Sequence, residues 1–167
     1  GLLLAILLHD IGHGPFSHAL ERKLVPAHHE ELTLAYMRIL NEEFDQQLDM
    51  AIAIFKGEYP RIFFNQLVSS QLDVDRLDYL KRDSFYAGVT EGNINSERLI
   101  NTFAVVDDRL VSEEKAIYSV EKFLMARRFM YWQVYLHKTS IVAELMLSKA
   151  IERASELVQN GVELAVD

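Results

Sequence analysis

The sequence contains no cysteine, and only 3 of its 167 residues are proline and 7 are glycine. Without cysteine there is no disulfide framework, no catalytic thiolate and no cysteine-ligated zinc site. Few prolines and glycines exclude collagen-like and low-complexity chains. Because an absence of cysteine is consistent with a reducing compartment, we expect a cytoplasmic protein.

Positive charge is also scarce, since 17 Lys and Arg residues stand against 25 Asp and Glu residues, for a formal net charge of -8. Nucleic acids and anionic membranes carry the same sign of charge and would repel such a chain. We therefore expect no broad nucleic-acid surface and no membrane partner. Half of the residues are hydrophobic, which is typical of a globular domain with a sizeable core.

The apolar segment at residues 1–8, GLLLAILL, is far shorter than the roughly 18 residues of a membrane-spanning helix. It also lacks the basic region and cleavage site of a secretion signal. We interpret it as the buried end of a helix that starts upstream. On this interpretation the chain is a fragment, with further sequence both before and after it.

Hydrophobic periodicity predicts a mainly helical chain. Pro15 is expected to begin a helix that runs to Val25, where Pro26 ends it. Amphipathic or apolar patterns predict further helices at residues 28–41, 49–55, 62–68 and 71–86.

Glycine supplies the expected ends of the later helices, with Gly88 closing residues 71–86 and Asn160-Gly161 closing a longer stretch. No proline or glycine interrupts residues 113–159, so one or two long helices are predicted there. β-branched residues flank Asp107-Asp108 and predict a hairpin around 102–112. The expected fold is a single all-α domain with one small β-hairpin.

The first candidate metal-binding or catalytic residues follow the apolar segment directly, at residues 9–18, HDIGHGPFSH. The adjacent imidazole and carboxylate of His9 and Asp10 could bind one divalent cation, although such a pair also occurs as a plain helix cap and turn. Gly12 and Gly14, on either side of His13, favour a site, because glycine permits unusual backbone conformations and close approach by a ligand.

A second group of candidates lies in the expected helix 71–86, where Asp75, Tyr79 and Asp83 are spaced four residues apart. This spacing places them on one stripe, with Arg76 beside them. A solvent-exposed face would also carry charges, but a tyrosine within the stripe is less typical of one. Asp73 and Asp78 are expected to pair with nearby basic residues.

Candidate acid-base residues follow the first histidines. His18 and Glu21 are three residues apart, so the carboxylate could orient the imidazole. His28 and His29 stand at the start of the next helix, where Glu30 and Glu31 complement the positive end of the helix dipole. Farther along, basic and aromatic residues between 123 and 138 are typical either of a core or subunit interface or of a ligand pocket.

Residues 9–18 resemble the core motif of HD-domain phosphohydrolases, and the extension to His18 is similar to the branch that hydrolyses deoxynucleoside triphosphates. Residues 71–83, QLDVDRLDYLKRD, are similar to the segment that supplies the family's last metal ligand. The resemblance extends from His9 to about residue 150. It implies an HD-domain helical bundle that acts on a nucleotide, as a homo-oligomer.

The resemblance also implies a divalent metal ion held by a histidine, an adjacent His-Asp pair and a distant aspartate. His9 and Asp10 would be the pair and Asp75 the distant ligand, whereas the first histidine would lie before Gly1. Nitrogen and oxygen ligands together leave Mg²⁺, Mn²⁺, Fe²⁺, Ni²⁺, Co²⁺ and Zn²⁺ open.

Further roles implied by the resemblance concern proton transfer and substrate contact. His18, assisted by Glu21 and His29, would protonate the leaving oxygen; the family has aspartate where this chain has Glu21. The substrate contacts would come from residues near the phosphates, near the sugar and at the pocket border: His13, Arg76, Tyr79, Asp83, Arg127, Tyr135, His137 and Lys138. Leu136 departs from the family pattern at that border.

The implied reaction is the hydrolysis of deoxynucleoside triphosphates to deoxynucleoside and inorganic triphosphate. The metal motif alone is equally consistent with another HD activity, such as a nucleoside monophosphate phosphatase or a cyclic-nucleotide phosphodiesterase. A non-catalytic nucleotide-sensing module is the third alternative.

Overall fold

The computed structural model describes residues 1–21 and 27–163. The amino-terminal half consists of helices joined by loops, with one 3₁₀ turn in the histidine-rich segment. In chain order these elements are α1 (Leu2–Leu8), η1 (Ser17–Ala19), α2 (His29–Glu43), α3 (Asp49–Phe55) and α4 (Ile62–Val68).

The second half contains a two-stranded hairpin, three shorter helical elements and the longest helices. They are α5 (Val74–Ala87), α6 (Ser96–Ile100), β1 (Phe103–Val106), β2 (Arg109–Ser112), η2 (Glu114–Ala116), α7 (Ile117–Met130), the π-helical turn η3 (Tyr131–Tyr135) and α8 (Lys138–Gln159). The predicted all-α fold with a small hairpin is confirmed.

Several helix ends follow the expected signals. Asp73 caps α5 by accepting a hydrogen bond from the backbone N of Arg76, and Gly88 ends it with a left-handed φ of 69°. Gly161 likewise has a φ of 78° behind α8. These ends are local features, because each depends on residues within one turn of the helix.

The hairpin is antiparallel, with Phe103 opposite Ser112 and Val106 opposite Arg109. Asp107 and Asp108 form its turn with φ values of 47° and 62°, as a type I′ turn requires. The Asp108 carboxylate accepts hydrogen bonds of 2.6 Å from Arg61 Nε and from the backbone N of Ile62. The turn is thereby attached to the start of α4.

The predicted helix behind Pro15 is wrong, and the predicted burial of the apolar segment holds on one side of its helix only. Only the 3₁₀ turn η1 forms behind Pro15 within the described residues, and residues 22–25 of the expected helix lie outside them. Phe16 and Ser17 have φ values of 60° and 48°, which an α-helix does not allow. The apolar segment is helical but not buried all round, since Leu3 and Leu7 are 83% and 75% exposed.

The second half differs from the prediction in one element. The short helix α6 was not expected, although its Asn95 cap is a recognisable start signal. The stretch 113–159 forms two long helices, one of the two predicted outcomes, and they are divided at Leu136-His137 because the π-helical turn η3 changes the direction of the chain before α8.

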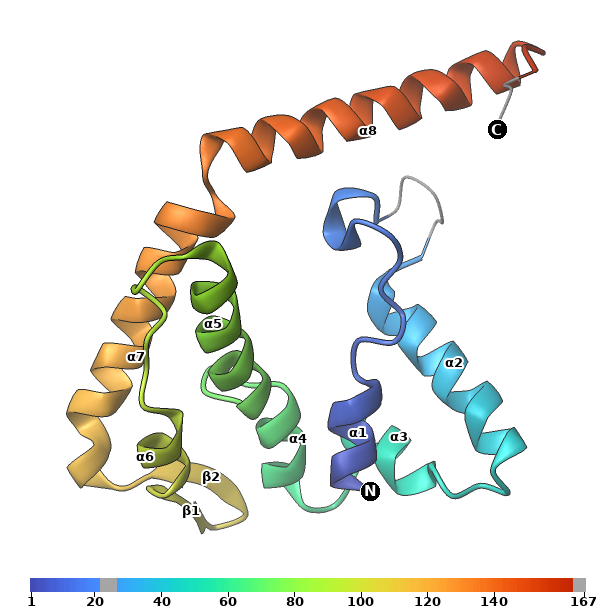
Figure 1. Cartoon of the computed structure of the whole chain (residues 1–167). Coiled ribbons are helices and arrows are strands. Elements are labelled where there is room, and N and C mark those ends of the chain that lie inside the picture. The colour runs from blue at the N-terminus through green and yellow to red at the C-terminus, as the bar shows by residue number, and fades with distance from the viewer. Residues whose placement is uncertain (22–26, 164–167) are drawn as a thin grey trace.

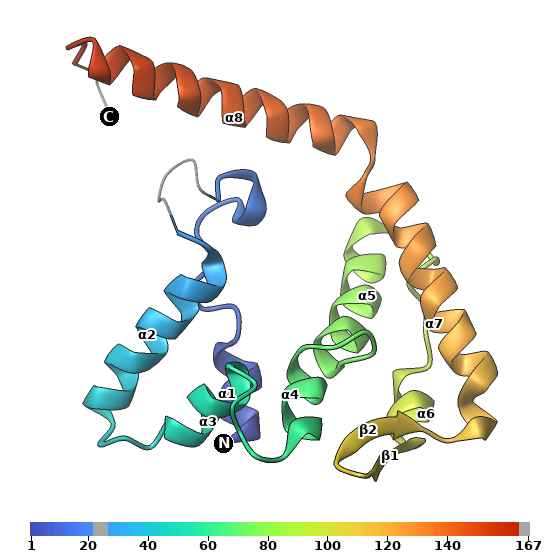
Figure 2. The ribbon, with the colours of Figure 1, turned by 180° about the vertical axis from the view of Figure 1, so that it is seen from behind.

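The hydrophobic core is divided into two clusters (Figure 1). One lies among α1 to α4 around Ala5, Met37 and Ile54. The other joins α5, α6 and α7 around Leu80 and Phe123. Seen from both sides, α8 extends from the carboxyl end of α7 toward the first half of the chain, where it contacts η1 (Figure 2). None of the described side chains of α8 is buried.

Within the described residues, no helix combines the length and the hydropathy that crossing a membrane would require.

Candidate functional site

A large cavity lies between the two halves of the molecule, with a volume of about 820 Å³. Its size falls within the range of about 300–1,000 Å³ that is usual for small-molecule sites. The lining side chains come from the histidine segment, the start of α2, the α3–α4 region, α5 and η3. They are His9, Asp10, His13, Ser17, His18, His29, Glu30, Phe55, Val68, Ser69, Asp73, Asp75, Arg76, Tyr79, Arg82, Asp83, Tyr131 and Tyr135.

His9 lies near both of the other predicted metal ligands, Asp10 and Asp75, at one end of this cavity, but the ligand atoms of these three described side chains do not all lie within 4.8 Å of one another. His9 stands directly behind α1 and Asp75 in the first turn of α5, so the two come from opposite halves of the molecule. His9 Nε2 lies 3.4 Å from Asp10 Oδ2 and 3.6 Å from Asp75 Oδ1. The tertiary fold thus brings together residues that are 65 or more positions apart in the sequence.

The environment of the His9 ring fits a bound cation. Its Nδ1 lies 2.6 Å from the backbone oxygen of Ile6 and donates to it, so Nε2 presents a lone pair to the two carboxylates. Among the described residues, His9 Nε2 is the one buried side-chain nitrogen or oxygen without a hydrogen-bond partner. The lone pair of His9 Nε2 and the negative carboxylate oxygens repel one another, and a proton or a cation bound at Nε2 would remove this repulsion.

The pKa of His9 reflects the same geometry. Interaction with the Asp75 carboxylate raises it to about 9, against the opposing effect of burial. Without a metal, a proton therefore occupies the position that a divalent cation would take.

Thr33 on α2 holds the histidine segment in place. Its buried hydroxyl donates to the backbone oxygen of His9 at 3.1 Å and accepts from the backbone N of Gly12 at 3.0 Å. Gly12 lies so close to α2 that a Cβ would overlap the backbone oxygen of His29 and the backbone nitrogen of Thr33. The absence of a side chain at Gly12 thus serves helix packing rather than the approach of a ligand.

We expect Gly12→Ala to destabilise the protein by about 1–3 kcal/mol, because the added methyl group separates the histidine segment from α2. Gly14→Ala is the matched control, since nothing lies within 4 Å of a Cβ at Gly14 and its φ is not left-handed. Urea unfolding followed by circular dichroism measures both. Equal midpoints for the two variants would contradict this account.

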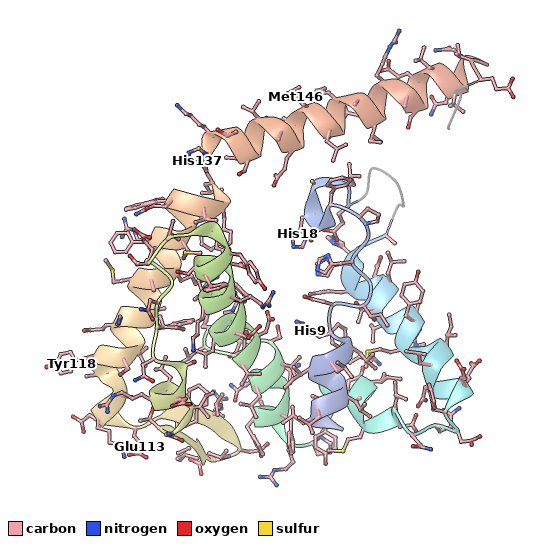
Figure 3. The ribbon with its side chains drawn as sticks, in the orientation of Figure 1. His9, His18, Glu113, Tyr118, His137 and Met146 are labelled. Atoms are coloured by element: carbon pink, nitrogen blue, oxygen red, sulfur yellow. The ribbon has the colours of Figure 1, made fainter. Side chains whose placement is uncertain are left out.

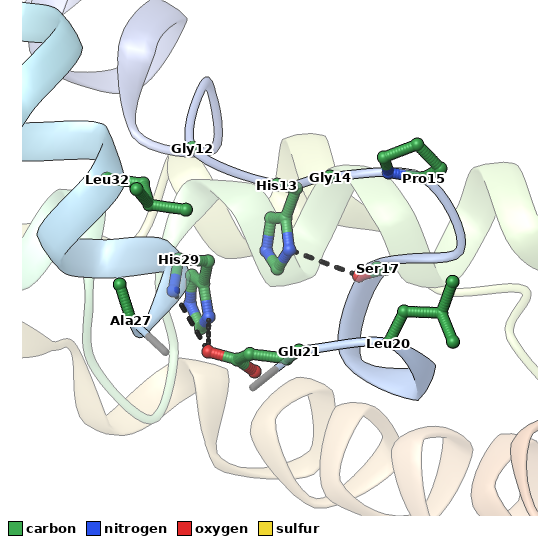
Figure 4. A pocket seen from close by; sticks show the side chains of 10 residues that line it. All are labelled: Gly12, His13, Gly14, Pro15, Ser17, Leu20, Glu21, Ala27, His29 and Leu32. Atoms are coloured by element: carbon green, nitrogen blue, oxygen red, sulfur yellow. Dashed lines mark hydrogen bonds and ion pairs between the residues drawn. The ribbon is translucent and has the colours of Figure 1, made fainter. Parts of the chain in front are cut away.

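The acid-base candidates form a second group beside the metal ligands. Glu21 accepts a hydrogen bond from His18 Nδ1 at 2.9 Å with one carboxylate oxygen. Its other oxygen accepts from His29 Nδ1 at 2.9 Å, from the His29 backbone at 2.9 Å and from His28 Nδ1 at 2.7 Å. Figure 4 shows Glu21 below His29, with His13 bonded to Ser17 nearby. His29 lines the large cavity, whereas His28 does not.

The pKa values of this group follow from these contacts. Hydrogen bonds from His18 and from the backbone and ring of His29 hold the pKa of Glu21 well below its usual range. Burial and the neighbouring His29 lower the pKa of His13. Glu21 is therefore an anionic acceptor at neutral pH, and the predicted contact between His18 and Glu21 forms across a 3₁₀ turn instead of an α-helix.

The stripe on α5 forms one wall of the cavity. Asp75, Tyr79 and Asp83 all line it, while Leu77 and Leu80 on the other side of the helix are buried in the core. The Tyr135 hydroxyl donates to Asp83 Oδ2 at 2.7 Å. Burial, and to a smaller extent this hydrogen bond to Asp83, raises the pKa of Tyr135, so the hydroxyl keeps its proton. The π-helical turn η3 thus carries a residue that orients Asp83.

Arginine side chains supply the positive charge of the cavity. Arg76 Nε donates to Asp73 Oδ2 at 3.1 Å and to the backbone oxygen of Ser70 at 2.8 Å. Burial acts to lower the pKa of Arg76, but the nearby Asp73 carboxylate raises it overall. Arg82 also lines the cavity and is paired with Asp78 at 2.8 Å. Asp73 and Asp78 thus pair with basic residues, as expected.

Other predicted site residues lie elsewhere in the structure. Arg127 donates to Gln71 Oε1 at 3.3 Å and does not line the cavity. His137 caps α8 by accepting from the backbone N of Thr139 at 3.3 Å, and Lys138 is the first residue of that helix. In Figure 3 His137 lies at the junction of α7 and α8, away from His9. Of the border residues, Tyr135 alone reaches the cavity.

The sequence patterns missed several residues that the structure places at the site. Ser17, Glu30, Arg82 and Tyr131 line the cavity, and Thr33 holds the histidine segment from α2. Thr33 follows His29 by four residues and Tyr131 precedes Tyr135 by four, so helical spacing from known candidates would have found both. No local sequence signal marks Ser17 or Glu30 as a residue of the site.

The cavity is negatively charged, since five carboxylates and two guanidinium groups line it. An anionic ligand would be repelled from such a surface unless cations are bound there. The site therefore combines His9, Asp10 and Asp75 at one end with the histidines His13, His18 and His29 beside them.

Comparison with known protein families gives two matches that together span most of the chain. Residues 1–83 match the HD domain, and residues 94–164 match the HD associated region. All the proposed metal ligands and acid-base candidates lie within the first match.

Individual relatives cover nearly the whole chain. It is 39% identical to the uncharacterized protein YwfO of Bacillus subtilis, over 95% of this chain and 38% of that protein. It is 29% identical to a deoxynucleoside triphosphate triphosphohydrolase SAMHD1 homolog of Dictyostelium discoideum, over 96% of this chain and 35% of the relative. The chain thus spans less than half the length of these curated relatives.

A solved structure resembles the fold throughout. The crystal structure of a phosphohydrolase from Bacteroides thetaiotaomicron shares 60% sequence identity and a TM-score of 0.95, covering 99% of this chain and 41% of that one. With the family matches, these similarities show that the chain belongs to the HD-domain family, with an HD domain at residues 1–83 and an HD-associated region at residues 94–164.

Proposed function

We propose that this chain carries the active site of a metal-dependent phosphohydrolase that cleaves deoxynucleoside triphosphates into deoxynucleoside and inorganic triphosphate. The observation that carries the proposal is the single cavity that joins the His9, Asp10 and Asp75 group to the His18 and His29 group. A cation site beside a proton donor is the arrangement that phosphate ester hydrolysis requires.

His9, Asp10 and Asp75 would hold the divalent cation, and the unpartnered His9 Nε2 is the observation that fits it. When bound, the metal ion supplies Lewis acidity toward a phosphoryl oxygen and lowers the pKa of a water ligand. Mg²⁺, Mn²⁺, Fe²⁺, Ni²⁺, Co²⁺ and Zn²⁺ all accept such a mixed nitrogen and oxygen set.

His18 is the proposed general acid for the leaving oxygen. Its Nδ1 is held by Glu21, so the Nε2 is the atom that delivers a proton into the cavity. Glu21 also binds His29 and compensates the positive charge of a protonated imidazole. The extra methylene of Glu21, relative to the family aspartate, does not prevent these contacts.

Asp83 and Tyr79 are proposed to contact the sugar, and Arg76 and His13 the phosphates. The hydrogen bond from Tyr135 leaves the rest of the Asp83 carboxylate able to accept from a sugar hydroxyl. Specificity for deoxynucleotides is supported by the relatives named as deoxynucleoside triphosphate triphosphohydrolases. Arg127, His137 and Lys138 lie outside the cavity, so their predicted substrate contacts would require a rearrangement or another site.

Assembly of identical copies is part of the proposal. Helix α8 exposes Val142, Leu145 and Met146 by 54%, 57% and 68%, which is more apolar surface than a helix usually leaves to water. These side chains offer a surface for self-association.

Product analysis tests the reaction. The full chain is incubated with Mn²⁺ and each deoxynucleoside triphosphate, and the phosphate products are separated by ion chromatography. We expect inorganic triphosphate, its loss with a chelator and its recovery when Mn²⁺ is restored. Orthophosphate as the sole product would instead indicate another HD activity, and nucleotide binding without any product would indicate a sensing module.

A further inference from the structure

Three histidines gather beside the first cation site without sharing a ligand with it. One ring nitrogen each from His13, His18 and His29 lies within 4.8 Å of the other two. The ring centroids are 4.9 Å apart for His13 and His18, 5.0 Å for His18 and His29, and 4.1 Å for His13 and His29. Such a group has the composition of a transition-metal site.

Glu21 prepares two of these rings for metal binding. It accepts hydrogen bonds from Nδ1 of both His18 and His29, which fixes the tautomer that leaves each Nε2 with a free lone pair. A carboxylate that binds the far nitrogen of a histidine ligand is the usual second layer of a zinc site. Figure 4 shows this contact between Glu21 and His29.

We propose that His13, His18 and His29 form a second metal site, selective for Zn²⁺ and similar borderline cations, with Glu21 orienting two of the ligands. Neutral imidazoles favour Zn²⁺, Co²⁺, Ni²⁺ and Cu²⁺ over Mg²⁺, which prefers oxygen ligands. The site therefore differs in selectivity from the one at His9, Asp10 and Asp75, where two of the three ligands are carboxylates.

Metal binding requires one local rearrangement. The rings of His13 and His29 are stacked with an interplanar angle of 13°, so their in-plane lone pairs do not converge on one point. Rotation of the His13 ring would break its hydrogen bond of 3.2 Å to Ser17 Oγ and move its Nε2 away from Asp10 Oδ1, which lies at 3.6 Å. The His18 side chain is 67% exposed and is free to approach.

A competing set of ligands is less suitable. Glu21, His28 and His29 also lie close enough to share an ion. The Glu21 oxygen in that set already accepts from both imidazoles and from the His29 backbone. A cation there would have to replace these hydrogen bonds, whereas binding by His13, His18 and His29 keeps them.

The expected consequence of occupancy is inhibition, and this part rests on the proposed function. A metal ion on His18 Nε2 takes the lone pair that carries the proton for the leaving oxygen. Zn²⁺ beyond the amount that fills the first site should then stop hydrolysis, while excess Mg²⁺ should not. The binding of the metal itself can be measured whether or not the chain hydrolyses nucleotides.

Co²⁺ is the probe, because tetrahedral Co²⁺ absorbs visible light much more strongly than octahedral Co²⁺. The full chain carrying Asp75→Ala, which weakens the first site, is titrated with Co²⁺ and compared with double variants that add His18→Ala, His29→Gln or His28→Ala. Circular dichroism checks that each variant is folded. His28→Ala is the matched control, since His28 is bound to Glu21 but belongs to the competing set.

We expect the Asp75→Ala chain to bind one Co²⁺ with a tetrahedral spectrum, and His18→Ala or His29→Gln to weaken this binding by about tenfold or more. His28→Ala should leave it unchanged. Absence of the tetrahedral spectrum in the Asp75→Ala chain would overturn the proposal. So would a spectrum that survives His18→Ala but disappears with His28→Ala, because that result assigns the ion to the competing set.

Discussion

Replacing Asp75 by asparagine should reduce hydrolysis by about 1,000-fold or more, because the loss of several kcal/mol of metal assistance corresponds to that factor. Asp75 is the proposed ligand on α5, and the other two proposed ligands come from the segment behind α1. The amide keeps the size of the side chain but removes the negative charge that attracts the cation. Steady-state release of inorganic triphosphate and the metal content of the purified variant measure the two effects.

Asp78→Asn is the matched control for this experiment. Asp78 lies on the same helix, is exposed and pairs with Arg82, but it does not line the cavity. Breaking an exposed pair changes stability by only about 0–1 kcal/mol, so we expect nearly full metal content and activity. If Asp75→Asn bound the metal and turned over as well as Asp78→Asn, the assignment of Asp75 as a ligand would be wrong.

Met130→Ala should lower the free energy of unfolding by about 2–5 kcal/mol, the usual cost of emptying a large buried site. Met130 is 0% exposed and belongs to the cluster that joins α5 to α7, with Leu80 and Phe123. This cluster fixes α7 and η3 against α5, so its loss also disturbs the contact between Tyr135 and Asp83. Urea unfolding followed by circular dichroism and tryptophan fluorescence gives the free energy.

Met125→Ala provides the comparison within the same helix, because Met125 is 47% exposed. A substitution at such a surface usually changes the free energy of unfolding by no more than about 0.5 kcal/mol. The difference between the two variants therefore measures burial in the α5–α7 cluster rather than a change of helix propensity. Similar unfolding midpoints would show that this cluster does not hold the second half together.

Much of the secondary structure could be predicted from the sequence, because its signals are local. The ranges expected for α3 and α4 match the structure, and the glycine ends of α5 and α8 are confirmed. The hairpin was recognisable from Asp107-Asp108 between β-branched residues. The Pro15 helix failed because proline permits a helix start but does not supply the hydrophobic contacts that stabilise one.

The sequence by itself determined which residues are candidates for the chemistry, namely a histidine-rich segment and an acidic stripe with period four on a later helix. Only the tertiary structure decided that His9 and Asp75 meet, that Thr33 and Gly12 hold the histidine segment, and that Tyr135 reaches Asp83. It also placed Tyr135 in the cavity wall and His137, two residues later, outside the cavity, because the π-helical turn ends between them. The reason is physical: periodicity records the face of a helix, whereas the distance between two faces depends on how the two core clusters pack.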